Sequence, residues 1–309
     1  MASGNTSSFQ NDNLSNLFLN LDFFRLIGGE QPFTNLQVLD LFTRTSRDTS
    51  NYNALVLTLR NNNWHGLYFD LNYTFSKSLD TVGAVQNDAR YYSSSYNRHL
   101  DYGPSFFDRP HVFNAVFNYD MPFGKNRWLS SSHAAVNHMI GGWYTAGIFR
   151  RSSGVPEIAS FSGQAFGGGI IFATPAGAIP TVPVSSLGGG SVHDTGNGNL
   201  NYFADPTAAA AKFRPALIAT DTNIGRTSAL RGLPFWNLDM RFGKVTHITE
   251  QVRVEFSADF FNIFNHVNFL DPSFDLTNPS NFGVINTQLV PADRNSGARW
   301  IQMGLRIDF

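Results

Sequence analysis

The chain has no cysteine among its 309 residues. That absence excludes disulfide-stabilised scaffolds, thiolate metal sites and cysteine nucleophiles. Charge is scarce as well, because Asp, Glu, Lys and Arg together make up 15% of the chain and the net charge is −1. No basic stripe is therefore present that could follow the phosphates of a nucleic acid. We expect no nucleic-acid partner.

Long apolar runs are also missing. No window approaches the roughly 18 consecutive apolar residues of a membrane-spanning helix. The first residues, MASGNTSSFQ, have neither the basic n-region nor the apolar h-region of a secretory signal peptide. The sequence therefore predicts no membrane helix, and no signal peptide in its opening residues.

Aromatic residues, by contrast, are abundant: they form 14% of the chain, with 29 Phe. They are spread through segments in which apolar and polar residues alternate, as they do in strands. Bulky rings at every second position favour β structure because they pack side by side on a pleated face. The alternation is strongest in residues 67–76, 111–123, 251–260 and 301–309.

The length of these segments is their most informative property. We count seven or eight strands, most of them about 10 to 14 residues long, whereas strands of globular proteins average roughly 5 to 6 residues. A tilted strand needs about 9 to 11 residues to cross a bilayer. Weaker alternation adds strands around Leu55–Leu59, Trp143 and Trp236–Phe242, and Leu36–Thr43 is a further candidate with poor alternation.

The connections between these strands alternate between short and long. The predicted short ones are a compact turn in the NNN run after Arg60, residues 124–139 and the THITE run at 246–250; the long loops cover about 78–105, 154–232 and 265–297. Loops this long are uncommon in compact domains. Outer-membrane barrels, however, alternate short periplasmic turns with long extracellular loops. Residues 34–309 are expected to form barrel, and residues 1–33 a loop or a remnant of a preceding barrel region.

Periodicity alone does not tell which face points outward, because a soluble lipocalin-like barrel alternates in the opposite sense. Two features favour the membrane. The polar faces carry charges of both signs on neighbouring strands, and five tryptophans fall at or near strand ends, like the aromatic girdles at membrane interfaces. These tryptophans are Trp64, Trp128, Trp143, Trp236 and Trp300. The predicted location is the outer membrane, with its lipid as a partner.

The two predicted faces give two sets of candidate residues. Polar residues of the alternating segments are expected to face the barrel lumen: Asp70, Asn72, Asn114, Asn118, Asp239, Arg241, Arg253, Glu255, Asp259 and Arg306. In the last strand the odd positions are apolar and are expected to face lipid: Ile301, Met303, Leu305, Ile307 and Phe309.

No motif predicts catalysis, a metal site or a cofactor. His133 and His138 are expected in a turn, without the spacing of a zinc site. The run DTGNGN at 194–199 lacks the bidentate Glu of a calcium loop and does not repeat. Neither glycine triplet, 167–169 or 188–190, is followed by Lys-Ser or Lys-Thr, so both are expected to be flexible loop. Carboxylates on the strands are better explained as members of lumenal ion-pair networks than as acid/base pairs.

Several whole segments, in order and spacing, resemble the C-terminal barrel of TonB-dependent receptors, in particular the Oar-like group with a carboxypeptidase-regulatory-like domain. The matching stretches are residues 50–60, 66–80, 108–127, 140–156, 256–269 and the closing strand ending in Phe309. The resemblance implies an all-β, antiparallel transmembrane segment of a larger barrel of about 22 strands. It also implies that the closing strand, Ile301 to Phe309, is the assembly signal that the barrel-insertion machinery reads.

The resembling receptors also carry a signal peptide, a TonB-contacting segment and a plug, none of which occurs in this sequence. We therefore expect the chain to be a C-terminal fragment of a nutrient transporter that does not transport alone and that meets TonB only through the missing N-terminal regions. Its extracellular ligand is not readable. Alternatives are a stand-alone outer-membrane porin or adhesin-like small barrel and, less favoured, a barrel-borne enzyme.

Overall fold

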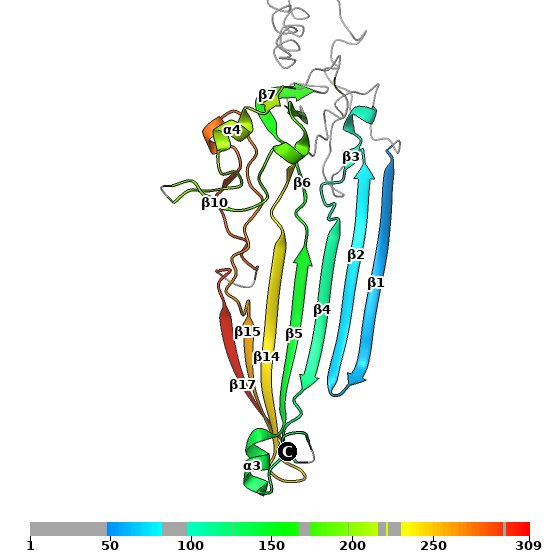
Figure 1. Cartoon of the computed structure of the whole chain (residues 1–309), viewed down its shortest axis with the longest axis vertical. Coiled ribbons are helices and arrows are strands. Elements are labelled where there is room, and N and C mark those ends of the chain that lie inside the picture. Colours follow the sequence, from blue (N-terminus) through cyan, green and yellow to red (C-terminus); the bar gives the residue numbers. More distant parts are fainter. Residues whose placement is uncertain are drawn as a thin grey trace, which may run out of the picture.

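The computed structural model of the chain describes residues 48–81, 98–125, 127–166, 174–196, 198–215, 221, 230–292 and 295–309. The candidate strand at Leu36–Thr43 and the segment 1–33 lie outside these residues. The described chain is dominated by one antiparallel sheet of long strands, drawn upright in Figure 1. Its order is β1 (Ser50–Trp64), β2 (Leu67–Asp80), β4 (His111–Asp120), β5 (Trp143–Ser152), β14 (Phe235–His247), β15 (Arg253–Phe261) and β17 (Trp300–Asp308), with β3 (Gly103–Pro104) beside the end of β2.

The sheet is open in the part of the chain that the structure describes. β1 (Ser50–Trp64) pairs with β2 alone and β17 (Trp300–Asp308) with β15 alone, so that both outer edges are unpaired. The sequence predicted long antiparallel strands at these places, and the structure confirms them. An open sheet is also what the sequence predicts for a sector of a larger barrel, because so few strands would enclose little lumen for so many polar residues.

Two predicted boundaries at the short-turn end are wrong, and a third prediction there differs from the structure. The NNN run is not a turn: β1 continues to Trp64 through a register shift, and the turn is His65–Gly66, whose φ angles of 53° and 87° suit a tight hairpin. β4 ends at Asp120 instead of Phe123, because the chain turns through Pro122, which has no N–H to donate, and Gly124 at φ 106°.

The third difference concerns the connection from β4 to β5. It contains a short helix, α3 (Ala134–Ile140), so that His138 is helical and His133 is the N-cap residue instead of both lying in a turn. This helix lies at the lower end of the sheet in Figure 1, the end at which the C-terminus is also drawn. No helix of the described residues has the length and apolar character needed to span a membrane.

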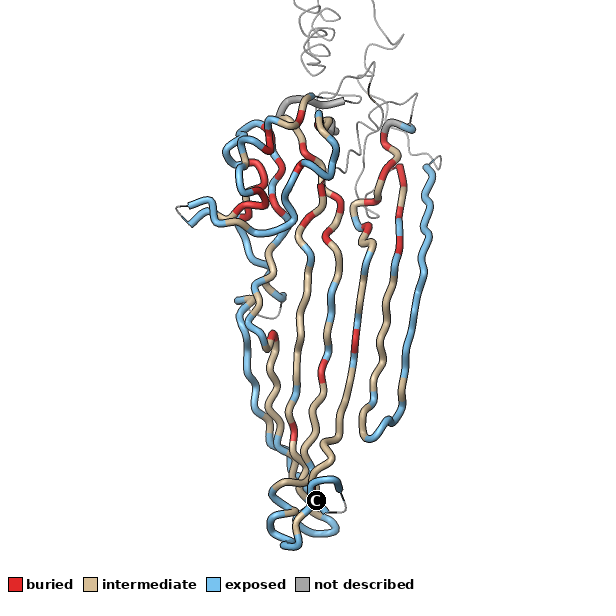
Figure 2. Tube along the Cα trace, viewed as in Figure 1, coloured by how far each residue is buried: buried red, intermediate tan, exposed pale blue. Residues whose placement is uncertain are grey.

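At the other end of the sheet, the described parts of residues 154–234 and 266–292 fold into a compact unit, here called the cap. Figure 2 shows that most buried residues lie in the cap and near the upper strand ends, while the long strands are largely intermediate or exposed. The cap contains β6 (Pro156–Glu157), β7 (Ser160–Phe166), β8 (Thr174–Gly177), β9 (Ile179–Pro180), β10 (His193–Asp194), β11 (Leu200–Asn201), β12 (Phe213–Arg214), β13 (Leu230–Arg231), β16 (Val284–Ile285) and α4 (Pro206–Ala210), with 3₁₀ turns at Val184–Ser186 and Pro279–Asn281. A further 3₁₀ turn, Arg98–Asp101, precedes β3.

The cap has its own apolar core. Phe282 is completely buried, and its ring stacks on that of Phe203 with 5.3 Å between ring centroids. Tyr202 and Phe274 meet edge to face at 5.2 Å, a favoured aromatic arrangement. The two loop segments that supply these rings are far apart in the sequence, so the core joins the two long loops into one unit.

One glycine triplet belongs to this packing. Gly188–Gly190 was expected to be flexible loop, but all three residues have positive φ, and a Cβ on Gly189 would lie 2.1 Å from the Tyr202 ring. Glycine is required there by close approach and by the left-handed backbone. The other triplet, 167–169, lies outside the described residues. The described residues of the DTGNGN run extend from β10 toward β11, and Asp194 accepts a hydrogen bond from the amide of Gly196.

Candidate functional site: the two faces of the sheet

The strand register gathers the polar residues of the sheet on one face. Directly opposed residues of antiparallel strands point to the same side, and the pairings Asn72–Asn114, Asn114–Arg150 and Arg150–Asn237 cross β2, β4, β5 and β14 in one row. A second row joins Arg241 to Asp259 and Asp259 to Gln302. By the same register, one side, here called the polar face, holds all the polar residues predicted from the sequence: Asp70, Asn72, Asn114, Asn118, Asp239, Arg241, Arg253, Glu255, Asp259 and Arg306.

Charges on the polar face compensate each other. Arg60 of β1 meets Asp70 of β2 at 2.6 Å, and Arg241 of β14 donates to Asp259 of β15 at 2.7 Å. Three further ion pairs lie on this face. One is a longer contact between strands, Arg150–Asp239 at 3.7 Å, and two join neighbouring positions of one strand, Arg253–Glu255 at 3.1 Å and Arg306–Asp308 at 2.8 Å. Exposed pairs of this kind contribute only about 0 to 1 kcal/mol each. Their effect is a hydrophilic wall without strong local excess of either charge.

Two glycines allow the sheet to accommodate large rings. Tyr144 of β5 lies over Gly243 of β14, where a Cβ would be 2.2 Å from its ring. The Tyr144 hydroxyl thereby reaches across to β15 and donates to Glu255 at 2.5 Å. On the opposite side, Phe117 covers Gly147 in the same way, because a Cβ on Gly147 would be 2.4 Å from the Phe117 ring. Aromatic rings over cross-strand glycines are a known way of fixing register.

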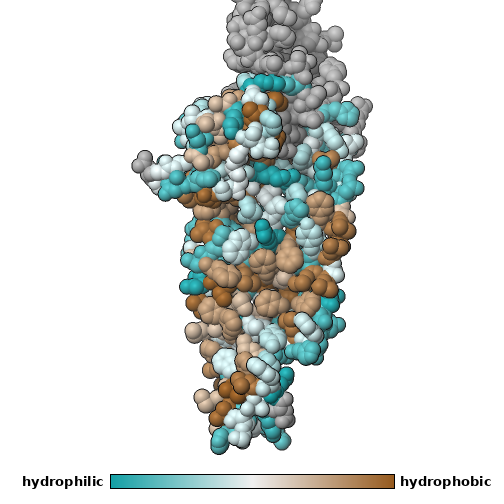
Figure 3. All heavy atoms as spheres, viewed as in Figure 1, coloured by the Kyte–Doolittle hydropathy of each residue, from teal (hydrophilic) through white to brown (hydrophobic). Residues whose placement is uncertain are grey.

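The opposite side, here called the apolar face, carries the other half of each strand. Phe113 and Phe149 pack across β4 and β5 at 5.9 Å, and Phe242 and Phe260 across β14 and β15 at 5.8 Å. At the edge, Leu305 of β17 is 68% exposed. Figure 3 shows hydrophobic residues gathered over the middle of the long strands. So large an exposed apolar surface requires an apolar environment.

Tryptophans border the apolar face. Trp64 pairs with Leu67, and Trp143 pairs with Lys244, whose ammonium lies 5.1 Å from the Trp143 ring, both at the short-turn end. Trp236 lies at the loop end of β14 and stacks on His266 at 4.1 Å. Trp300 also begins a strand, but its pairing with Phe261 puts it on the polar face. It therefore departs from the girdle that the sequence predicted.

The five predicted residues of the closing strand lie together on one side. In β17, Ile301, Met303, Leu305 and Ile307 oppose the apolar-face residues Phe260, Ala258, Phe256 and Val254, and Phe309 follows the strand. Phe309 is 97% exposed. No residue of the described chain pairs with the outer edge of β17, so the backbone of this strand is available to another strand.

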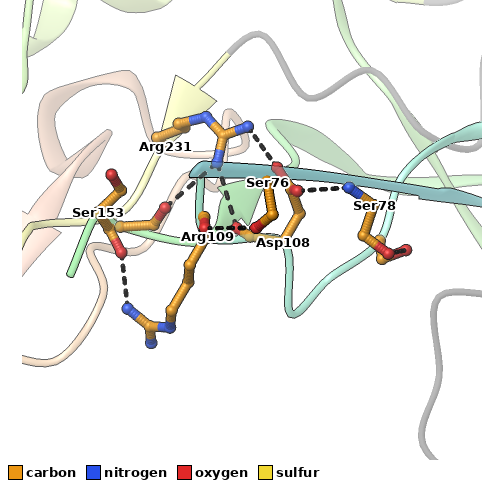
Figure 4. Close-up of polar contacts among 8 residues, drawn as sticks. Ser76, Ser78, Asp108, Arg109, Ser153 and Arg231 are labelled. Atoms are coloured by element: carbon orange, nitrogen blue, oxygen red, sulfur yellow. Dashed lines mark hydrogen bonds and ion pairs between the residues drawn. The ribbon is translucent and has the colours of Figure 1, made fainter. Parts of the chain in front are cut away.

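A polar cluster that the sequence did not predict ties the cap to the sheet (Figure 4). Asp108 is 2% exposed and accepts hydrogen bonds from the Ser78 amide of β2 at 2.7 Å and from Arg231 of β13 at 2.8 Å. Arg231 also donates to the carbonyl of Gly154 at 3.3 Å. Beside it, Arg109 donates to the Ser153 carbonyl at 2.7 Å. The cluster joins three connections of the chain at the point where the strands enter the loops.

Two carboxyl groups of the cap lie in a poorly hydrated place nearby. Burial, with the charge of Asp271 as a second cause, raises the pKa of Glu157 to about 7. Burial also raises the pKa of Asp271, although the Arg109 charge opposes that rise. Among the described residues, no group of three His, Cys, Asp or Glu side chains is close enough together to hold a metal ion.

The raised pKa predicts how cap stability depends on pH. In the folded cap Glu157 holds its proton more tightly than an ordinary glutamate, whose pKa is 4.5. The stability that this proton binding adds to the folded cap is therefore fully present below pH 4.5 and is lost as the pH rises through about 7. Hydrogen exchange of the cap amides should therefore be faster at pH 8 than at pH 5, after correction for intrinsic rates. Glu157→Gln should reduce this pH dependence, whereas Glu250→Gln at the short-turn end should leave it unchanged; equal profiles for wild type and Glu157→Gln would contradict the assignment.

An antiparallel sheet of membrane-crossing strands, hydrophilic on one face and apolar on the other, defines the wall of a membrane β-barrel. A family model described as outer membrane beta barrel domain matches residues 10–302. The chain therefore belongs to this family, and its location is the outer membrane. No curated protein and no solved structure matches the chain.

Proposed function

We propose that the chain forms the C-terminal sector of the barrel of a TonB-dependent receptor that takes up a nutrient, with the cap on the extracellular side. The observation that carries this proposal is the direction of the two open edges. β1 (Ser50–Trp64) and β17 (Trp300–Asp308) both run from the loop end to the short-turn end, because an even number of antiparallel steps separates them. Closure of one edge on the other would therefore be parallel.

The same restriction applies between copies. Rotation about an axis along the membrane normal keeps strand direction, so β17 of one copy would also meet β1 of the next in parallel. Outer-membrane barrels are antiparallel and, in single bacterial chains, even-numbered. The described sheet thus needs an odd number of further strands from outside the described residues. The candidate strand Leu36–Thr43 alone would complete an eight-stranded barrel, whose narrow interior leaves little room for the many polar residues of the polar face. A larger receptor barrel meets both needs, and the polar face then lines its lumen.

The cap supports a receptor over a simple pore. An aromatic core holds the two long loops together, and the Asp108–Arg231 pair fixes the cap to the strand ends. A preorganised surface above a hydrophilic wall suits ligand capture at low concentration. Transport by this sector alone is not proposed, because an energised receptor also needs a plug and a TonB-contacting segment.

A genetic test separates the receptor from the alternatives. In the native host, the gene is deleted with and without deletion of tonB, and fitness is measured over a panel of ferric siderophores, glycans and peptides. The proposal predicts that deletion of the gene slows growth on at least one nutrient when tonB is present. In the tonB-deleted strain, deletion of the gene should slow growth on that nutrient no further. A defect of the same size in both backgrounds would indicate a passive porin, and no defect together with lost surface attachment would indicate an adhesin; either result contradicts the proposal.

The closing strand is proposed as the signal that the barrel-assembly machinery reads. Phe309 is almost fully exposed and would lie at the membrane interface, where transfer free energy is small. Phe309→Asp, or removal of Phe309, should therefore lower the surface level of the full protein several-fold while leaving the thermal stability of the inserted fraction nearly unchanged. Trp128→Asp, a matched change of an exposed aromatic residue in the β4–β5 connection, should insert normally.

Surface biotinylation measures the inserted amount, and the retained electrophoretic mobility of unheated samples measures stability. Normal surface levels for both Phe309 variants would contradict a role in recognition. A stability loss that matches the loss of surface protein would show that Phe309 acts through packing instead.

A further inference from the structure

The apolar face carries positive charge at its loop end that nothing in the described part of the chain compensates. Lys77 of β2 and Arg151 of β5 are both exposed. Their pairings with Asn53 and Phe113 place them on the apolar face. Among the residues that the structure describes, neither side chain makes a hydrogen bond or an ion pair. Arginines of the polar face behave differently, since Arg60 and Arg241 each have a carboxylate partner.

Carboxylates are absent from the strand residues of this face. Every Asp and Glu in the long strands falls on the polar face by register, including Asp70, Asp120, Asp239, Glu255 and Asp259. Lys77 and Arg151 therefore have no strand carboxylate within reach along the surface that borders the apolar band. A cation at the border of hydrocarbon is stabilised by water or by an anion, and on this face no strand carboxylate of the described residues supplies that anion.

His111 connects the two cations. It opposes Phe75, so Lys77 and Arg151 are its diagonal neighbours on β2 and β5, about 7 to 8 Å away between backbones. The Tyr73 hydroxyl bonds to Nδ1 of His111 at 2.8 Å, which leaves Nε2 for an outside group. Lys77, His111 and Arg151 together are called the cation patch.

Aromatic side chains frame the cation patch on the membrane side. The Phe75 ring lies 5.2 Å from that of His111, and Phe113 packs against Phe149 directly below. Trp236 opposes Arg151 across β5 and β14. Lys77 lies above Phe75 along β2, whereas Arg151 is level with Phe113 and Trp236 and has Phe149 below it. Each cation thus has aromatic rings beside it or on its membrane side, and a lipid with a charged headgroup and acyl chains offers a partner for both.

The other membrane boundary of the same face lacks such a patch among the described residues. Lys244 lies there, but its ammonium donates to the carbonyls of His138, Met139 and Gly141 at 3.0, 2.8 and 2.7 Å and lies over Trp143. Its donors are satisfied within the protein. Among the described strand residues of the apolar face, the cations without a protein partner therefore lie at the loop end.

We propose that the cation patch binds the phosphate groups of a phosphorylated glycolipid of the outer leaflet. One phosphate lies between Lys77 and His111 or between His111 and Arg151, and the acyl chains run along Phe75, Phe113 and Phe149. Assignment to the outer leaflet rests on the orientation in the proposed function, with the cap outside. It does not depend on the transported nutrient or on TonB. Lipid bound in this way would hold the outer wall of the barrel in register with the surrounding leaflet.

The test measures equilibrium binding of fluorescent, doubly phosphorylated lipid A to the intact detergent-extracted outer-membrane protein. The variant Lys77→Gln with Arg151→Gln removes both patch charges. The matched control, Lys125→Gln with Arg127→Gln, removes the same charges from the exposed β4–β5 connection. Each cation near an anionic lipid surface contributes enough that the patch variant should bind about 30-fold more weakly, while the control binds like the wild type. Lipid A stripped of both phosphates should bind the wild type as weakly as intact lipid A binds the patch variant.

Three outcomes would overturn the proposal. The first is equal binding of lipid A by the wild type and the patch variant, and the second is equal binding of phosphorylated and dephosphorylated lipid A by the wild type. The third is equal affinity for inorganic phosphate alone, because the acyl chains would then contribute nothing. Stronger binding of phosphatidylglycerol than of lipid A would place the patch in the inner leaflet and would contradict the orientation, whereas the tonB fitness test is unaffected by any of these results.

Discussion

Replacement of Asp108 with alanine is expected to lower the free energy of unfolding of the cap by about 3 kcal/mol, near the lower end of the 3 to 5 kcal/mol that breaking a buried ion pair costs. Asp108 is nearly inaccessible, and its loss leaves the Ser78 amide without its acceptor and Arg231 without its carboxylate. The side chain of Arg231 is 37% exposed. Water can therefore hydrogen-bond to the guanidinium that has lost its carboxylate, and this limits the loss of stability to about 3 kcal/mol.

Native-state hydrogen exchange measures this effect at the amide of Gly232, which follows β13 (Leu230–Arg231) and donates to the carbonyl of Val155 at 2.8 Å. Asp108→Asn keeps an acceptor for Ser78 and should cost less than alanine. Asp194→Ala, which removes an exposed carboxylate from the β10–β11 turn, should change exchange by less than about 1 kcal/mol. Equal effects of Asp108→Ala and Asp194→Ala would mean that the buried pair does not hold the cap on the sheet.

A charge on the apolar face of the closing strand should have the second large effect. Leu305→Arg places a guanidinium beside Phe256 on the side proposed to face lipid, at a cost of about 2 to 4 kcal/mol if the position is near the bilayer midplane. Urea-induced unfolding of the full protein in lipid vesicles measures the change. The control is the reverse substitution at the next residue, Arg306→Leu, which replaces a charged side chain with an apolar one.

Arg306 faces the other way and is 74% exposed, with Asp308 at 2.8 Å. Its replacement removes a solvated pair that contributes about 0 to 1 kcal/mol. Leu305→Arg should therefore destabilise the barrel much more than Arg306→Leu. The reverse order, or equal losses, would indicate that odd positions of β17 do not face lipid.

The long strands could be predicted because each of them meets two different environments. Side chains at every second position face the same environment, and those between them face the other. The alternation in Leu67–Phe75 or Val252–Phe260 therefore indicates both the strand and its two faces. The turns follow weaker rules. His65–Gly66 needed positive φ at both residues, and the three asparagines before it concealed the turn because asparagine also favours such positions.

The cap could not be predicted from periodicity. Its core joins Phe203, Phe274 and Phe282 from two loops that the long strands β14 and β15 separate in the sequence, and its elements are too short to show a period. The glycines at 188–190 suggested flexibility for the same reason, although Gly189 is fixed by Tyr202. The Asp108–Arg231 pair is likewise a contact between distant loops, and a lone Asp and a lone Arg in a sequence carry no signal of their partnership.

The polar face is expected to line water and the apolar face to meet lipid. Single labelled cysteines measure this central assignment directly, because these 309 residues contain no cysteine and any cysteine elsewhere in the full protein is first replaced by serine. Single cysteines at residues 301–309 of the full protein in lipid vesicles are labelled with a nitroxide, and its collision rates with oxygen and with a water-soluble nickel chelate are recorded by electron paramagnetic resonance. We predict a period of two, with Ile301, Met303, Leu305 and Ile307 favouring oxygen and Gln302, Gly304, Arg306 and Asp308 favouring nickel. A profile without that period, or with the opposite phase, would contradict the assignment of the two faces.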